Sequence, residues 1–370
     1  MATITPPTAR ASRSPLAWLR WRRWFGARSH RPGATRGAAV ATVSPSDGRT
    51  LPQLTDYALE HVIARNDRAT IYRAIEKTTE QRVALKILRL GGQGGDEGAS
   101  EIWRERFLRE SAAAARLVHD HIVRVHAGGV QGTGTALTGW LAMEWVHGTD
   151  MSRYASPTRL LPEGVVLGIA ARVARALQVA HDAGIVHRDI KPSNVLFDPT
   201  RGTVKVTDFG SARVADTAAT RSGLILGTPC YMAPEQLEGA PATPQTDLYV
   251  LGVMIYELLT GERPFSGPSM GELLARIARE PAPNLIEARP DLPPMLGELV
   301  ARLLAKAPQA RPADARQVAR DLRLAQAHCD AAHPGSAAAA WADTSPGEDP
   351  GLEPDRTLAD RPSFRGTIID

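Results

Sequence analysis

The 370-residue chain has only two cysteines, Cys230 and Cys329. Two thiols cannot build the disulfide network of a small secreted domain, so the sequence favours a reducing compartment. The chain also lacks a run of eighteen apolar residues, because its best candidate, 248–259, is interrupted by Glu257. The sequence therefore predicts no transmembrane helix. Since the N-terminus has no continuous apolar segment of a secretory signal, a cytoplasmic location is expected.

Excess charge of one sign is absent from the middle of the chain. The net charge is +4, yet residues 1–50 hold nine Arg and one acidic residue, whereas residues 330–370 hold eight acidic residues and three Arg. The pI of about 9.3 therefore reflects a basic tail. Nothing in this distribution indicates a nucleic-acid-binding domain, and no nucleic-acid partner is expected.

Composition divides the chain into three parts. Residues 1–50 are rich in Arg, Pro, Ser and Gly, residues 328–370 are rich in Ala, Pro and acidic residues, and both tails are expected to be disordered. Between them, strand-like patterns cover 57–88, 122–125 and 140–145, with one helix predicted over 101–117. The remainder reads as helices over 163–183, 247–260, 270–279, 294–305 and 313–327. A strand-rich first third followed by helices predicts an α+β fold with two lobes.

The basic tail contains a short aromatic patch within residues 16–25. Trp18, Trp21, Trp24 and Phe25 would share one arc of a helix, with three Arg outside it. Such a helix could lie on anionic lipid as a peripheral membrane contact, or serve as a docking peptide. The alternative is a solvated basic tail with incidental tryptophans.

Several short motifs occur in a fixed order along the middle of the chain. They read Val83-Ala84-Leu85-Lys86, His187-Arg188-Asp189-Ile190-Lys191-Pro192-Ser193-Asn194, Asp208-Phe209-Gly210 and Ala233-Pro234-Glu235. With this set, residues 57–326 resemble a Hanks-type (eukaryotic-like) bacterial serine/threonine protein kinase domain. The resemblance implies a small β-rich N-lobe with one major helix over a larger helical C-lobe. It also implies transfer of the γ-phosphoryl group of ATP to Ser or Thr hydroxyls of protein substrates.

The resemblance assigns roles to the residues of these motifs. Asp189 would accept the proton of the substrate hydroxyl, and Lys191 would steady the γ-phosphate. Asn194 and Asp208 would supply oxygen ligands to Mg²⁺, or to Mn²⁺ in its place. Thr228 resembles the threonine that links Asp189 to Lys191 in serine/threonine kinases.

Further residues are implied to bind ATP. Lys86 would contact its α- and β-phosphates, paired with the carboxylate of Glu110 in preference to that of Glu105. The adenine would bond to the backbone of a hinge, with Met143 as the gatekeeper. The hinge residues are Met143, Glu144 and Val146.

The nucleotide loop departs from the family pattern, because all three of its glycine positions (64, 66 and 69) carry other residues. It reads Ile63-Ala64-Arg65-Asn66-Asp67-Arg68-Ala69-Thr70-Ile71. Glycine permits backbone N–H groups to approach phosphates closely. Either Arg65 or Arg68 reaches the phosphates of an active kinase, or the chain is a pseudokinase that serves as a scaffold. The retained charged residues favour an active enzyme.

The remaining signals concern support and regulation. Glu235 is expected to pair with Arg311, and Asp247 to anchor the catalytic loop. Arg188 indicates regulation through an activation segment from 208 to 235, whose phosphorylation candidates are Thr217, Thr220 and Ser222. The acidic tail holds two Thr-x-x-Asp sequences, which resemble ligands of forkhead-associated domains. Their phosphorylation candidates are Thr357 and Thr367.

Overall fold

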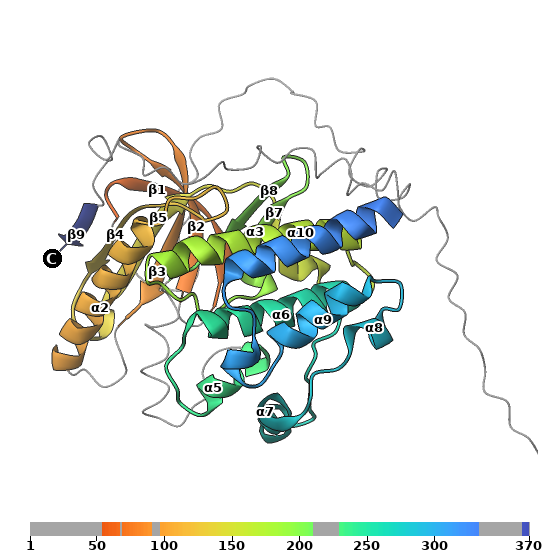
Figure 1. Ribbon diagram of the computed structural model, residues 1–370. Coiled ribbons are helices and arrows are strands. Elements are labelled where there is room, and N and C mark those ends of the chain that lie inside the picture. Colours follow the sequence, from red (N-terminus) through yellow and green to blue (C-terminus); the bar gives the residue numbers. More distant parts are fainter. Residues whose placement is uncertain (1–53, 67–68, 91–96, 210–228, 333–364, 370) are drawn as a thin grey trace, which may run out of the picture.

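A β-sheet lies beside a bundle of helices in the computed structural model (Figure 1). The structure describes residues 54–66, 69–90, 97–209, 229–332 and 365–369. Most of the sheet comes from the first third of the chain, and most of the helices follow residue 163. The predicted α+β fold with two lobes is therefore confirmed.

The sheet of the N-lobe contains six strands in the order β1-β2-β3-β5-β4-β9. All neighbours are antiparallel except β4 and β9, which are parallel. Val83, Leu85 and Ile87 of β3 are buried, as expected for alternate residues of a central strand that face a core. The strands are β1 (Tyr57–Arg65), β2 (Ala69–Glu76), β3 (Arg82–Arg89), β4 (Val125–Gln131), β5 (Thr138–Glu144) and β9 (Arg365–Ile369).

The single long helix of the N-lobe, α2 (Glu97–Ala115), packs on β4 and β5. It begins four residues before the predicted start. Phe107 of α2 is buried against Gly139 of β5, where an added Cβ would lie 2.7 Å from the Phe107 ring. Such close contact requires glycine at this position, because real Cβ atoms do not approach ring atoms so closely.

The C-lobe is built around α3 and α6, whose side chains are almost entirely buried. The last helix, α10, lies along α3 (Figure 1). The helices are α3 (Glu163–Asp182), α5 (Pro234–Leu237), α6 (Pro244–Thr260), α7 (Met270–Arg279), α8 (Leu285–Ala288), α9 (Pro294–Leu303) and α10 (Ala315–Ala332). The five helices predicted here are all present, with ends that differ by up to five residues.

A small second sheet in the C-lobe carries the segment that matters most for function. It consists of β6 (Thr149–Asp150), β7 (Val195–Asp198) and β8 (Thr203–Val206). Residues 183–194 connect α3 to β7 and contain the predicted catalytic residues. The loop is therefore held at one end by a buried helix and at the other by a paired strand.

The C-terminal tail differs from the prediction of disorder over 328–370 at both of its ends. Helix α10 continues to Ala332, because Ala325 and Cys329 extend its buried face by another turn. Residues 365–369 form β9, whose backbone pairs with the edge of the N-lobe sheet. The basic tail 1–50 and its patch at 16–25 lie outside the described residues.

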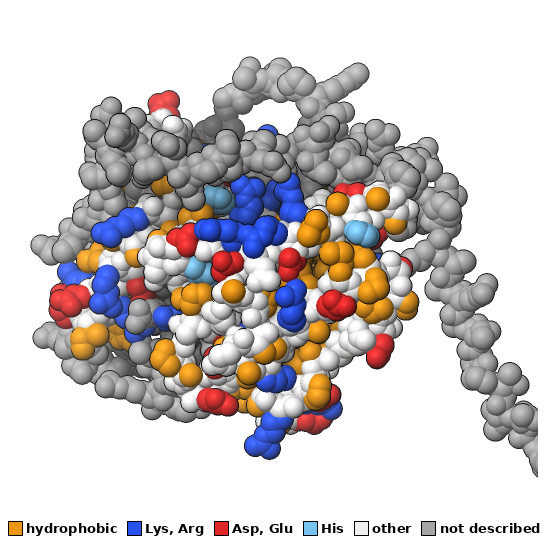
Figure 2. All heavy atoms as spheres, viewed as in Figure 1, with side chains coloured by type: hydrophobic (Ala, Val, Ile, Leu, Met, Phe, Trp, Pro, Cys, Tyr) orange, Lys and Arg blue, Asp and Glu red, His pale blue; other side chains and the backbone are white. Residues whose placement is uncertain are grey.

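Lys and Arg side chains gather on the face above α3 and α10 (Figure 2). Nearby, the guanidinium of Arg172 of α3 is buried and has two cationic neighbours, Arg175 of α3 and Arg323 of α10. Burial, followed by the two neighbouring guanidiniums, lowers the pKa of Arg172 to about 10. None of the described helices combines the length and the apolar character that crossing a bilayer requires.

Candidate active site

The connection between α3 and β7 gathers three of the predicted catalytic residues. Lys191 Nζ lies 2.9 Å from Asp189 Oδ1 and 2.7 Å from Oδ2. The Asn194 side-chain amide donates to the Asp189 carbonyl oxygen at 2.7 Å and to Oδ2 at 3.0 Å. The Asp189 carboxylate is thereby oriented by a cation and an amide, while about a third of its side chain remains exposed. It is held in place, yet a substrate can reach it.

Helix α6 anchors the same loop through its backbone. Asp247, fully buried in the first turn of α6, accepts hydrogen bonds from the backbone N–H groups of His187 (2.8 Å) and Arg188 (2.7 Å). The predicted anchoring role of Asp247 is therefore confirmed. His181 Nε2, at the end of α3, lies 2.8 Å from the same carboxylate. These contacts hold Arg188 at φ 70°, a left-handed conformation that most residues avoid.

Lys86 of β3 forms an ion pair with Asp208, with Nζ 2.7 Å from Oδ1. Burial disfavours the charge of Asp208, but the nearby Lys86 ammonium outweighs this effect and holds the pKa of the carboxyl below its ordinary value. Asp208 also has a left-handed backbone, with φ 70°. An ionised carboxylate thus sits between the two lobes, next to a cation from the sheet.

Glu110 is not where the sequence analysis expected it. Among the described residues, the partner of Lys86 is Asp208, and Glu110 instead pairs with Arg106 at 3.1 Å, one turn earlier on α2. The reason is geometric, because side chains at i and i+4 of one helix always lie close together. A contact between Lys86 and Glu110 depends on where the whole helix sits relative to the sheet. The predicted Lys86–Glu110 pair is therefore wrong for this conformation.

The predicted hinge leads from the sheet to the C-lobe. Met143 is buried in β5, as a gatekeeper position requires. The Glu144 side chain accepts hydrogen bonds from Lys205 Nζ at 2.6 Å and from the Arg124 backbone N–H at 2.8 Å. Within the described part of the chain, the backbone groups of Val146 make no hydrogen bond. They are thus available to the edge of a bound base.

The family model of the protein kinase domain matches residues 57–322. The chain belongs to the protein kinase domain family. Serine/threonine-protein kinase PknA of Mycobacterium tuberculosis is 39% identical over 271 residues, which cover 73% of this chain and 60% of PknA. Serine/threonine-protein kinase PkaA of Streptomyces coelicolor is 37% identical over 288 residues, covering 74% of this chain and 50% of PkaA.

Solved structures agree with this assignment. The crystal structure of the PknI kinase domain of Mycobacterium tuberculosis matches with a TM-score of 0.57 and 29% identity, covering 76% of this chain and all of that chain. Rad53 in complex with AMP-PNP matches with a TM-score of 0.57 and 26% identity, covering 72% of this chain and 64% of the other. The resemblance to bacterial Hanks-type serine/threonine kinases is therefore confirmed. The chain spans about half to three-fifths of the length of the bacterial kinases PknA and PkaA.

The nucleotide loop of this kinase domain closes on itself. Asn66 Oδ1 accepts a hydrogen bond from the Ala69 N–H at 2.8 Å, and the Asn66 N–H donates to the Ala69 carbonyl oxygen at 2.9 Å. Asn66 thus makes two hydrogen bonds that link the end of β1 to the start of β2. The third glycine position, Ala69, has its N–H engaged inside the loop, and this N–H cannot bind a phosphate at the same time.

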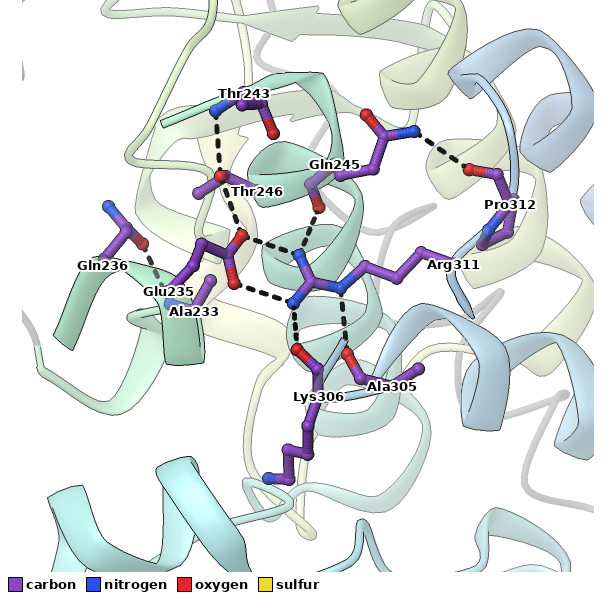
Figure 3. Close-up of polar contacts among 10 residues, drawn as sticks. All are labelled: Ala233, Glu235, Gln236, Thr243, Gln245, Thr246, Ala305, Lys306, Arg311 and Pro312. Atoms are coloured by element: carbon purple, nitrogen blue, oxygen red, sulfur yellow. Dashed lines mark hydrogen bonds and ion pairs between the residues drawn. The ribbon is translucent and has the colours of Figure 1, made fainter. Parts of the chain in front are cut away.

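A buried ion pair supports the C-lobe of the kinase domain (Figure 3). The Arg311 guanidinium donates to both carboxylate oxygens of Glu235, at 2.7 and 2.8 Å. Three backbone carbonyls accept its other hydrogen bonds, and Thr246 Oγ1 donates to the same carboxylate at 2.9 Å. The predicted Glu235–Arg311 pair is therefore confirmed. Its contact with Thr246 was missed, and no local sequence pattern indicates it.

Some predicted site residues lie outside the described residues. They are Asp67 and Arg68 of the nucleotide loop, Thr228 with the phosphorylation candidates Thr217, Thr220 and Ser222, and Thr357 of the tail. The described loop residues lie in β1 and β2: Ile63, Ala64 and Arg65 end β1, and Ala69, Thr70 and Ile71 begin β2. Thr367 lies in β9.

One contact near the site was not foreseen. His187 is fully buried, its Nε2 lies 2.8 Å from the Thr207 carbonyl oxygen, and its ring packs edge-on against Phe209. The histidine thus joins the catalytic loop to the segment that carries Asp208. In the sequence, the position of His187 in the His187-Arg188-Asp189 motif was the signal that could have indicated this contact.

Proposed function

We propose that this chain is an ATP-dependent protein kinase that phosphorylates Ser and Thr residues of protein substrates. The observation that carries the proposal is the cluster of Asp189, Lys191 and Asn194 near Asp208, whose ion-pair partner Lys86 comes from the other lobe. A carboxylate oriented beside a cation can take a proton from an alcohol, and a second cation from the sheet can hold phosphate oxygens.

The reaction follows from these positions. The substrate hydroxyl oxygen forms a bond to the γ-phosphorus, while the bond from that phosphorus to the bridging oxygen of ADP breaks. The hydroxyl proton passes to the Asp189 carboxylate. Lys191, at 2.7 Å from that carboxylate, supplies positive charge beside the transferring group.

The donor set fits Mg²⁺. The amide nitrogen of Asn194 is engaged by Asp189, and among the described residues its Oδ1 has no hydrogen-bond partner, so an oxygen is available beside the ionised Asp208. Two protein oxygens suit Mg²⁺ or Mn²⁺, which take further ligands from phosphates and water. When bound, the metal would neutralise charge on the phosphates.

Several finer points remain predictions. They are autophosphorylation of the activation segment, recruitment of a forkhead-associated domain by the tail, and a cytoplasmic location with peripheral membrane contact through residues 16–25. The scaffold alternative rests on the glycine-less loop alone. The retained cluster around Asp189 speaks against it, because a scaffold has no need of an oriented carboxylate.

The experiment is incorporation of ³²P from labelled ATP with Mg²⁺ into the chain and into a general substrate such as casein. Asp189→Asn should lower incorporation at least a hundredfold, and acid hydrolysis of the product should release phosphoserine or phosphothreonine. The matched control is Asp120→Asn, which makes the same change at an exposed carboxylate. Equal incorporation by the parent chain and Asp189→Asn would refute the proposal and favour the scaffold.

A further inference from the structure

The outer edge of the N-lobe sheet is covered by the far end of the chain. Strand β9 pairs in parallel with β4, residue by residue, from Arg365 opposite Ala127 to Ile369 opposite Gln131. The other neighbour of β4 is β5, so β9 takes the place of an edge strand (Figure 1). The pair joins residues that are more than 230 positions apart in the sequence.

An uncovered β4 would present a row of backbone N–H and C=O groups without partners. Such an edge binds other extended chains, and proteins usually shorten, charge or cover it. Along β4, Gly128 and Gly129 carry no side chain that could obstruct an approaching strand. The edge is therefore suited to accept a strand through main-chain hydrogen bonds.

The C-terminal segment is suited to be that strand. Thr367, Ile368 and Ile369 are consecutive β-branched residues, which favour extended backbone, in a tail otherwise rich in Ala, Pro and acidic residues. The 32 residues of 333–364 connect it to α10. A tether of a few tens of residues keeps a segment at about millimolar effective concentration near its own domain. Even a weak strand contact would then be mostly formed within one molecule.

We propose that the β4 edge is a docking site for residues 365–369 of the same chain, and that docking withholds Thr367 from phosphorylation and from any phosphothreonine-binding partner. A segment hydrogen-bonded to β4 cannot also lie extended in a substrate groove or on a partner domain. Thr357 belongs to the same tail but not to the strand, so it serves as the reference site. The docking itself does not depend on the proposed kinase activity, whereas the protection of Thr367 from phosphorylation does.

Docking also bears on α2. The Arg104 side chain of α2 donates to the carbonyl oxygen of Gly132, directly after β4, at 3.2 Å, and Phe107 shares a buried cluster with Val130 of β4. A strand that orders β4 thus supports the helix that carries Glu110. Loss of β9 is expected to speed amide hydrogen exchange in β4 and in α2, and to leave α6 unchanged.

The first experiment measures docking without nucleotide. A shortened chain that ends at residue 360 is mixed with a fluorescent peptide of residues 361–370, and binding is followed by anisotropy. The shortened chain should bind the peptide, whereas the full chain should bind it about tenfold more weakly, because its own segment competes at the effective concentration above. Ile368→Pro in the peptide should abolish binding, and Ile368→Val should preserve it.

Three results would overturn docking within one molecule. The first is that the shortened chain binds neither the parent peptide nor the Ile368→Val peptide. The second is that both chains bind the peptide equally well. A full-length dimer that becomes monomeric on shortening would show that the strand docks on a second copy.

The second experiment measures protection. Phosphate at Thr367 and at Thr357 is quantified by mass spectrometry in full chains that carry Ile368→Pro or Ile368→Val. The same sequences as free peptides, phosphorylated by the shortened chain, correct for the direct effect of residue 368 on recognition. The corrected ratio of Thr367 to Thr357 phosphate should rise at least fivefold in the proline variant. An unchanged ratio would refute protection, and an inactive chain would refute the proposed function while leaving the peptide result intact.

Discussion

Replacing Arg311 by Met should unfold the C-lobe at a markedly lower temperature. The substitution keeps the length of the side chain but removes the cation that binds both oxygens of Glu235. Both residues are less than 9% exposed, so water cannot replace the lost contacts without opening the structure. Removing one partner of a buried ion pair costs about 3–5 kcal/mol.

The contacts of Arg311 place the expected loss near the middle of that range. Thr246 still donates a hydrogen bond to Glu235, which reduces the loss of stability. Three backbone carbonyls also lose the donor that Arg311 provided, which increases it. About 4 kcal/mol corresponds to a fall in melting temperature of roughly 8–16 °C for a domain of this size. The measurement is thermal unfolding by circular dichroism at pH 7.

The pH dependence gives an independent check on the same pair. Burial opposes ionisation of Glu235, but the hydrogen bonds from Arg311 outweigh it and lower the pKa of the carboxyl. Its folded-state pKa therefore lies below the unfolded value of about 4.3, so its stabilising contribution is complete above that value and is lost as the pH falls through the folded-state pKa. Without Arg311, burial is opposed only by the hydrogen bonds from Thr246 and the backbone, and the pKa of the carboxyl should rise. The difference in stability between the parent chain and Arg311→Met should then shrink as the pH falls from 7 towards 5.

Two controls isolate the charge. Arg316→Met removes an exposed guanidinium 3.5 Å from Asp182 and should cost less than about 1 kcal/mol. The double variant Glu235→Leu with Arg311→Met, which buries no unpaired charge, should recover at least half of the loss. A melting temperature of Arg311→Met within 2 °C of the parent, or no recovery in the double variant, would refute the reasoning.

Three further substitutions test other parts of the molecule. Asn66→Gly should lower the KM for ATP about threefold or more with little change in kcat, because it releases a backbone N–H towards the phosphates; steady-state kinetics with an unchanged KM would contradict this. Gly139→Ala should lower stability by about 1–3 kcal/mol, because the new methyl group meets the Phe107 ring, and an unshifted thermal melt would count against it. Arg106→Ala should raise kcat about twofold or more, because it removes a cation of α2 that competes with Lys86 for the Glu110 carboxylate. Equal or lower turnover would argue that this pair does not restrain the enzyme.

Local motifs predicted the parts of the site that lie close together in the chain. Asp189, Lys191 and Asn194 fall within six residues, and their mutual contacts follow from one short loop. The buried Glu235–Arg311 pair is not local, and it was predicted only because the family resemblance supplied the partner. The helices of the C-lobe were predictable from their apolar periodicity, since each buries one face or all of its length.

Two features depended on tertiary position and could not be predicted. The partner of Glu110 is set by where α2 lies on the sheet, and the contact with Arg106 was not among the predictions. Strand β9 contains only five residues within a tail whose composition indicates disorder, and its pairing depends on an edge formed more than 230 residues earlier. Periodicity over so short a segment has little power to separate a strand from a loop.

The hydrogen bonds that Asp247 accepts from the catalytic loop have a practical consequence. This carboxylate holds main-chain N–H groups of residues 187 and 188, so the course of the loop is specified by peptide groups that every amino acid except proline possesses. Arg188 can accordingly be replaced by a residue that tolerates its left-handed backbone, such as Asn, while the loop keeps its path. The predicted regulatory role of Arg188 can therefore be tested by substitution without altering Asp189, Lys191 or Asn194.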